Sequence, residues 1–114
     1  MSDNCLFCKI IAGEIPCDKV YEDDLVIAFR DIAPVAPQHI LVVPKMHIVS
    51  TNDLNESNAS VVSHIFVTAR NLASELGFAE NGYRIINNCG ADGGQTVGHL
   101  HFHIIAGRHG GSMF

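Results

Sequence analysis

The sequence predicts an α+β fold in which about five mostly sequential antiparallel strands form one sheet, with one short and one long helix. Two periodicities support this prediction. Apolar residues recur with helical spacing between residues 58 and 76, whereas residues 99–104 alternate between histidine and apolar residues, which is typical of a strand. Short apolar runs separated by turn residues account for the remaining strands.

The first predicted element is a short helix over residues 5–12, with Asn4 as its cap and Gly13 as its stop. The long helix lies between residues 58 and 76 and ends at Gly77. Its apolar face follows the i, i+3, i+4, i+7 rule, which indicates that it packs against a core. That face comprises Val62, Ile65, Phe66, Ala69, Leu72, Ala73 and Leu76.

Turn residues bound the predicted strands. Asp23 and Asp24 form a tight turn between the first two strands, and Pro34 and Pro37 enforce a loop over residues 31–38. The strands are predicted over residues 20–22, 25–30, 39–43, 83–87 and 97–105, and a glycine-rich loop over residues 89–95.

Length and composition indicate one folded domain over residues 1–114. The chain is 47% hydrophobic and 17% charged, which excludes a disordered chain and favours a buried subunit interface. A formal net charge of −5 without any basic run argues against a nucleic-acid polymer as partner. No apolar stretch approaches the roughly 20 residues that span a bilayer, and no signal peptide is evident, so we expect a cytoplasmic protein without a membrane partner.

The most informative segment is the alternating row of His99, His101 and His103. Alternate residues of a strand point to the same face, so the three histidines share one face and the apolar residues between them can enter the core. These apolar residues are Leu100, Phe102 and Ile104. Imidazole is a nucleophile toward phosphorus at neutral pH, and it is equally a zinc ligand. The row alone therefore leaves covalent catalysis and a catalytic metal site open.

The glycine-rich loop directly before the row favours phosphate chemistry. Gly90, Gly93 and Gly94 allow backbone amides to turn toward an anion, and Gln95 and Thr96 add polar groups beside them. An ordinary connecting loop is the alternative, but its place immediately before the histidines favours an anion site.

The histidine row and this loop together resemble the histidine triad (HIT) superfamily, and within it the Hint branch of purine nucleoside phosphoramidases, of the bacterial type with a Cys-x-x-Cys pair. The resemblance extends over nearly the whole chain. Matching segments are residues 7–11, 14–16, 21–24, 29–32, 37–39 and 43–47. The resemblance implies a HIT-like fold whose sheet is extended across a homodimer.

It also implies an activity: hydrolysis of the P–N bond of purine nucleoside 5′-phosphoramidates, or of related nucleoside monophosphate esters, through a nucleotidyl-histidine intermediate and without a catalytic cofactor. His101 would be the nucleophile, oriented by the carbonyl of His99. His103 and Thr96 would contact the phosphate or leaving group, and His39 would complete the cluster. Purine nucleoside monophosphates and their phosphoramidates would be bound by Phe7, Asp31, Ile32, Asn88, Gly94, Gln95, Thr96, His101 and His103.

Cys5 and Cys8 form a Cys-x-x-Cys pair, whose spacing alone fits a redox motif, half of a zinc site or neither. The resemblance implies structural zinc, because His47 and His99 stand where some bacterial-type members carry the other two ligands. We therefore expect zinc bound by these four residues, without a role in the chemical step.

Three alternatives stay open: a dinucleoside polyphosphate hydrolase of the same superfamily, a zinc-dependent hydrolase that uses the triad as ligands, and a nucleotide-binding module without turnover. The C-terminal residues 108–114 depart from the aromatic tail of many Hint-type relatives, so no substrate preference is carried over from that tail. His64 and His109 fit no constellation and are interpreted as ordinary surface or capping histidines.

Overall fold

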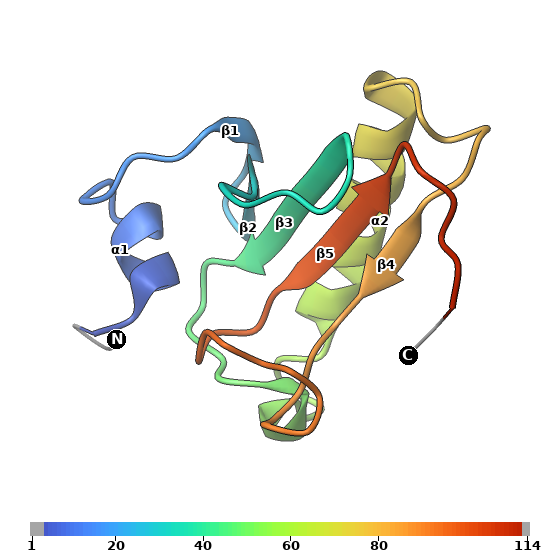
Figure 1. The fold of residues 1–114 in the computed structure, drawn as a ribbon. Coiled ribbons are helices and arrows are strands. Elements are labelled where there is room, and N and C mark those ends of the chain that lie inside the picture. The colour runs from blue at the N-terminus through green and yellow to red at the C-terminus, as the bar shows by residue number, and fades with distance from the viewer. Residues whose placement is uncertain (1–3, 113–114) are drawn as a thin grey trace.

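The computed structural model describes residues 4–112 and consists of a twisted antiparallel sheet with a long helix across one face and a short helix beside one end (Figure 1). The predicted α+β fold is confirmed. Its elements are α1 (Leu6–Ile11), β1 (Lys19–Glu22), β2 (Val26–Arg30), β3 (Gln38–Pro44), the 3₁₀ turn η1 (Thr51–Asp53), α2 (Ser60–Glu75), β4 (Arg84–Ile86) and β5 (Phe102–Ala106).

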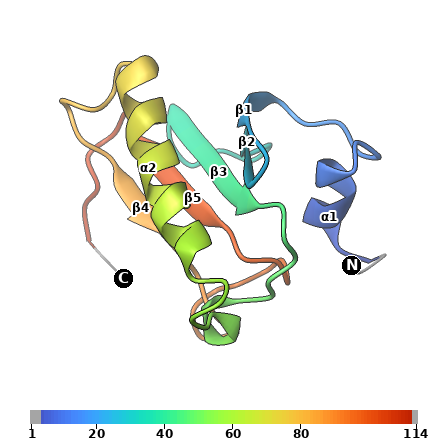
Figure 2. The same ribbon diagram turned by 180° about the vertical axis from the view of Figure 1, so that it is seen from behind.

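The sheet has the strand order β1-β2-β3-β5-β4, with every neighbouring pair antiparallel. Figure 2 shows α2 lying across the face formed by β3, β5 and β4, while α1 lies beside β1 and β2. In the register, His103 of β5 stands opposite Leu41 of β3 on one side and Ile86 of β4 on the other. Among the described elements, β4 forms one edge of the sheet and β1 forms the other.

Alternation along the strands divides the core into two layers. On the α2 side, Ile40 and Ile104 are completely buried and pack with Ile65 and Leu72 of the helix. On the other side, Phe7 of α1 packs with residues of β2 and β3 that have the opposite parity. These residues are Ile27, Phe29, Leu41 and Val43. Histidines placed on this second face therefore lie opposite α2 and close to α1.

The predicted strand over residues 97–105 is wrong in its first half, because β5 begins only at Phe102. The preceding residues bond elsewhere: Leu100 N–H donates to the Ile48 carbonyl at 2.6 Å, and the side-chain amide of Asn87 donates to the His101 carbonyl at 3.0 Å. β4 has already ended at Ile86, so its ladder with β5 does not extend to these residues.

Other differences are small. The side chain of Cys5, rather than that of Asn4, caps α1 by accepting a hydrogen bond from Cys8 N–H. β3 starts one residue earlier and ends one later than predicted, and β4 lacks one residue at each end of its predicted range. Within the described part of the chain, no helix combines the length and the apolar character needed to cross a membrane.

Candidate active site

Three histidines gather on the sheet face opposite α2. His39 comes from β3, His103 from β5, and His101 from the extended segment just before β5. The ring centroid of His103 lies 5.2 Å from that of His39 and 5.1 Å from that of His101. The alternation predicted from the sequence therefore has the expected result. His101 and His103 lie on one face, while Leu100, Phe102 and Ile104 enter the core on the other.

The orientation of His101 is set by its own chain. Its Nδ1 lies 2.7 Å from the backbone carbonyl oxygen of His99. A carbonyl can only accept a hydrogen bond, so Nδ1 carries the proton and Nε2 of the neutral ring keeps its lone pair. The ring of Phe7 packs edge-to-face on His101, with centroids 5.0 Å apart, and leaves the residue only 5% exposed. This histidine is therefore held with a nucleophilic nitrogen already available.

A chain of hydrogen bonds fixes the second histidine. Val35 N–H donates to Nδ1 of His39 at 3.2 Å, so the proton of a neutral His39 resides on Nε2. That Nε2 lies 2.9 Å from Nδ1 of His103 and 3.5 Å from a carboxylate oxygen of Asp31. His103 then accepts at Nδ1 and carries its own proton on Nε2. The ligand atoms of Asp31, His39 and His103 lie close enough together to hold a metal ion, but the hydrogen bond from Val35 N–H favours a proton on His39 Nε2.

The environment keeps His103 uncharged at neutral pH. Burial, followed by the neighbouring His101 and His39, lowers the pKa of His103 to about 4, and the carboxylate of Asp31 opposes this shift only weakly. A neutral His103 donates one hydrogen bond through Nε2 and does not repel its neighbours. Burial also lowers the pKa of His99.

The glycine-rich loop is braced by its own side chains. Gln95 accepts a hydrogen bond from Gly90 N–H at 3.0 Å and donates to the carbonyls of Val49 and Val97 at 2.7 and 3.0 Å. Asn88 donates to the Gly93 carbonyl at 2.7 Å. The side chain of Gln95, predicted to line a phosphate pocket, is thus engaged in shaping the loop.

Two of the glycines meet specific backbone requirements. Gly94 has a φ of +82°, which favours glycine. A Cβ atom on Gly93 would lie 2.3 Å from the Cys89 carbonyl oxygen, so only glycine permits this close approach. Thr96 is exposed and lines a cavity of about 540 Å³ together with Cys5 and His47.

Three of the residues expected to contact the nucleoside lie on the α1 side of the histidines: Phe7, Asp31 and Ile32. Phe7 packs on Phe29 of β2 as well as on His101. Asp31 follows β2 directly, and its carboxylate accepts a hydrogen bond from Ala33 N–H at 2.8 Å. Ile32 is fully exposed, which is unusual for an isoleucine and suits a residue that covers a bound ring.

Sequence reasoning missed two contributors. Val35 acts through its backbone N–H, which no residue-type pattern reveals. Asn87 holds the His101 carbonyl, and its neighbour Asn88 was singled out instead. His64, interpreted as an ordinary surface histidine, bonds through Nε2 to Asp23 at 2.7 Å and links α2 to the β1–β2 turn.

Cys5, Cys8, His47 and His99 form a second cluster, whose ligand atoms all lie within 4.8 Å of one another. Cys5 Sγ lies 3.3 Å and His47 Nδ1 3.1 Å from His99 Nδ1, and Cys8 Sγ lies 3.2 Å from His47 Nδ1. His99 Nε2 donates to the Pro44 carbonyl at 2.8 Å, so the lone pair of Nδ1 faces the cluster. These four residues could hold a metal ion.

Comparison with known proteins agrees with this geometry. Residues 12–110 match the family model of the HIT domain. The chain therefore belongs to the HIT family. It is 45% identical over 113 residues to the purine nucleoside phosphoramidase of Escherichia coli strain K12, covering 99% of this chain and 95% of that one.

Solved structures show the same similarity. A histidine triad protein from Clostridium difficile superposes with a TM-score of 0.93 at 56% identity, covering 96% of this chain and 95% of the other. A HIT family hydrolase from Clostridium thermocellum gives a TM-score of 0.95 at 49% identity, covering 98% and 97%.

Proposed function

We propose that this protein is a HIT family hydrolase that cleaves the P–N bond of purine nucleoside 5′-phosphoramidates, or of related nucleoside monophosphate esters. The observation that carries this proposal is the 2.7 Å bond between His101 Nδ1 and the His99 carbonyl, which leaves Nε2 as a nucleophile. The similarity to the Escherichia coli purine nucleoside phosphoramidase, which covers nearly the whole chain, supports the substrate class.

The reaction proceeds in two displacements at phosphorus. In the first, the lone pair of His101 Nε2 forms a bond to phosphorus while the P–N bond breaks, and its electron pair goes to the leaving nitrogen, which takes up a proton and departs as the amine. In the second, water attacks the same phosphorus, the bond to His101 breaks and the nucleoside monophosphate is released. Water loses one proton, which balances the proton taken up before.

The surroundings of His101 assist both displacements. The Nε2–H of His103 donates to a phosphoryl oxygen or to the leaving group, and the Asp31–His39 pair behind it holds that ring in place. Backbone groups of the loop around Gly94 and Gln95, together with Thr96, surround the phosphate, and Asn88 contacts the base or sugar. Phe7 and Ile32 enclose the base, and the carboxylate of Asp31 accepts hydrogen bonds from the ribose hydroxyls.

Zinc fits the second cluster, because two thiolates and two imidazoles are a typical structural zinc set. Bound there, it would supply a cross-link between α1 and the segment before β5. Cys5, Cys8, His47 and His99 would be its ligands, and the fixed backbone of His99 would continue to orient His101. No step of the reaction passes through this site.

We further propose that residues 1–114 act as one domain within a homodimer whose sheet continues across the subunits. β4 pairs on only one side among the described strands, so its outer edge can accept a second strand. Phe66 and Val67 on the outer surface of α2 are about half exposed, at 45% and 52%, and offer apolar area for such an interface. The cytoplasmic location stays a prediction from the sequence.

The decisive experiment compares hydrolysis of adenosine 5′-phosphoramidate by the wild-type protein and by His101→Ala, each before and after chelation. We expect turnover that survives chelation and collapses in the variant. Turnover lost on chelation and restored by zinc, with the fold intact, would instead make this a zinc-dependent hydrolase. A protein that binds AMP without any turnover would be a binding module, and faster cleavage of diadenosine polyphosphates would indicate a dinucleoside polyphosphate hydrolase.

A further inference from the structure

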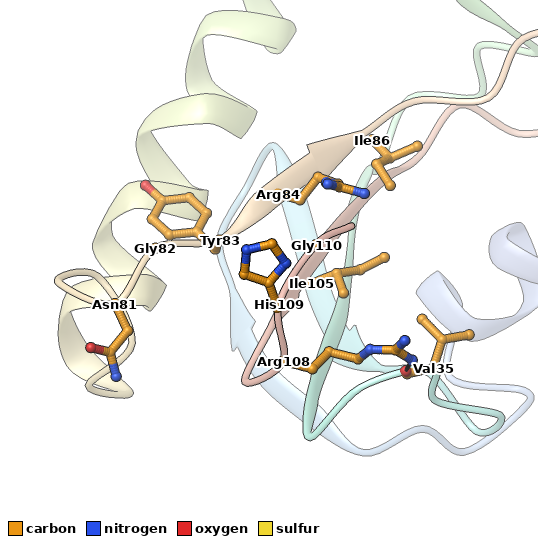
Figure 3. Close-up of a pocket in the computed structure, with 10 residues that line it drawn as sticks. All are labelled: Val35, Asn81, Gly82, Tyr83, Arg84, Ile86, Ile105, Arg108, His109 and Gly110. Atoms are coloured by element: carbon orange, nitrogen blue, oxygen red, sulfur yellow. Dashed lines mark hydrogen bonds between the residues drawn. The ribbon is translucent and has the colours of Figure 1, made fainter. Parts of the chain in front are cut away.

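The backbone just before β5 carries the nucleophile outside the ladders of the sheet. β4 ends at Ile86, beyond which its ribbon continues as coil (Figure 3), and β5 begins at Phe102. The pairing of β5 with β3 likewise stops at the pair formed by Phe102 and Val42. His101 directly precedes the first residue of β5, so its position must be fixed by groups outside these ladders.

A side-chain amide takes the place of the missing ladder bond. Asn87, the first residue after β4, donates through Nδ2 to the His101 carbonyl oxygen at 3.0 Å, and the bond is partly buried. The bond from His101 Nδ1 to the His99 carbonyl lies within one segment, so it sets the ring relative to its own chain. The bond from Asn87 instead fixes that chain relative to β4.

The orientation of the Asn87 amide is determined on both sides. The His101 carbonyl can only accept a hydrogen bond, so the amide nitrogen faces His101 and the amide oxygen faces away. That oxygen, Oδ1, accepts a hydrogen bond from the hydroxyl of Thr51, the first residue of η1. η1 is itself fixed by a capping box, in which Ser50 N–H donates to the Asp53 carboxylate at 3.2 Å.

The chain that leads to Thr51 also supports the rest of the site. The carbonyl of Ile48 accepts a hydrogen bond from Leu100 N–H at 2.6 Å, and that of Val49 accepts one from the side chain of Gln95 at 2.7 Å. One short stretch of chain therefore contacts both the segment before β5 and the glycine-rich loop.

The next asparagine binds the loop itself. Asn88 Nδ2 donates to the Gly93 carbonyl at 2.7 Å. Two adjacent side chains thus hold two parts of the site that must meet at the substrate: Asn87 holds the backbone of the nucleophile, and Asn88 holds the loop proposed to surround the phosphate. Misplacing a reacting atom by about 1 Å can cost about 100-fold in rate, so this double attachment bears directly on the attack at phosphorus.

We propose that Asn87 is a positioning residue of this hydrolase: oriented by Thr51, it holds the backbone of His101 so that Nε2 meets the phosphorus. The inference rests on the proposed function and goes beyond it by assigning part of the rate to residues outside the histidine row. Because Asn87 acts through the backbone of His101, its loss should slow the attack on phosphorus and leave nucleotide binding intact.

The first test compares Asn87→Leu with the wild-type protein. Leucine has a similar size and adds no charge, but it offers no donor to the His101 carbonyl. We expect single-turnover cleavage of adenosine 5′-phosphoramidate to slow by about 10- to 100-fold, while the dissociation constant of AMP changes by less than about twofold. Asn71→Leu, on the exposed side of α2, is the matched control and should cleave at the wild-type rate.

A second pair of variants tests the orientation by Thr51. Thr51→Val removes the hydroxyl at nearly constant shape and should slow the same step by about tenfold, since one hydrogen bond is lost. Thr51→Ser keeps the hydroxyl and should recover most of the rate. Since Thr51 acts through Asn87, Thr51→Val should have no further effect on the rate in the Asn87→Leu background.

Thermal unfolding of each variant separates positioning from stability. A melting temperature that falls while the single-turnover rate stays at the wild-type value would overturn the positioning role alone. Equal rates in Thr51→Val and Thr51→Ser would do the same, and this pair decides the question if Asn87→Leu does not fold. Failure of the wild-type protein to cleave adenosine 5′-phosphoramidate would overturn the proposed function, and the positioning role with it.

Discussion

Nε2 of His39 lies 2.9 Å from Nδ1 of His103, and the two residues come from adjacent strands of the sheet, β3 and β5. Because Val35 N–H occupies the other nitrogen of His39, the bond has one direction, from His39 to His103. The hydrogen bond from Val35 N–H, in the loop before β3, therefore determines that the proton of His103 resides on Nε2. His39 acts on the reaction through His103 and is a positioning residue.

This arrangement predicts that His39→Leu lowers kcat by about 10- to 100-fold, because the His103 ring loses the donor that fixes its tautomer. His39→Gln is the matched variant, since its amide nitrogen can donate to His103 Nδ1 in place of the imidazole. We expect His39→Gln to recover much of the rate under single-turnover conditions. Equal losses in the leucine and glutamine variants would show that only the packing of His39 matters.

A second prediction concerns stability and pH. The pKa of His103 is lowered to about 4 by burial and by the adjacent His101 and His39, whereas an unfolded histidine titrates near pH 6.5. Between these values the unfolded state binds more protons, so this contribution to the free energy of unfolding is complete above about pH 6.5 and is lost as the pH falls toward about 4.

Urea unfolding of the chelated protein between pH 7 and pH 4.5 measures this effect without interference from metal release. We expect the free energy of unfolding of the wild-type protein to fall more steeply over this range than that of His103→Gln. Parallel pH profiles of the two proteins would contradict a lowered pKa of His103.

The cysteine cluster predicts metal content. Wild-type protein should purify with a stoichiometric amount of zinc, and Cys8→Ser should carry little, because a tetrahedral site rarely survives the loss of a thiolate. Cys17→Ser is the matched control, since Cys17 lies outside the cluster. Elemental analysis gives the metal content, and thermal unfolding gives the stability. A normal zinc content in Cys8→Ser would exclude the proposed ligand set.

How far the sequence specified this site differs from residue to residue. Alternation in the histidine row correctly placed Leu100 and Ile104 in the core, because extended backbone keeps a period of two even where no ladder forms. The same pattern could not show where β5 begins, since that depends on Asn87 and Ile48 binding the preceding segment. The direction of the His39–His103 bond was equally hidden, because it depends on the path of a loop with two prolines.

Arg84 and Gly111 show the same limit from another side. They lie 27 positions apart and share no motif with the histidine row, so nothing in the sequence predicts that the Arg84 guanidinium donates to the Gly111 carbonyl. Only the antiparallel pairing of β4 with β5, followed by the return of the chain after Gly107, brings the two residues together.

The last prediction concerns the glycine-rich loop and tests whether this loop binds the phosphate or only connects two strands. In Gly93→Ala the new Cβ atom would lie 2.3 Å from the Cys89 carbonyl oxygen, a backbone atom that cannot move without shifting the loop. We expect weaker AMP binding, measured by calorimetry, and a loss of about 1–3 kcal/mol in the free energy of unfolding. Gly98→Ala is the matched control, because nothing lies within 4 Å of its added Cβ atom. If Gly93→Ala bound AMP as the wild-type protein does, with only its stability reduced, the loop would be a structural connection and the phosphate would be held by the histidines alone.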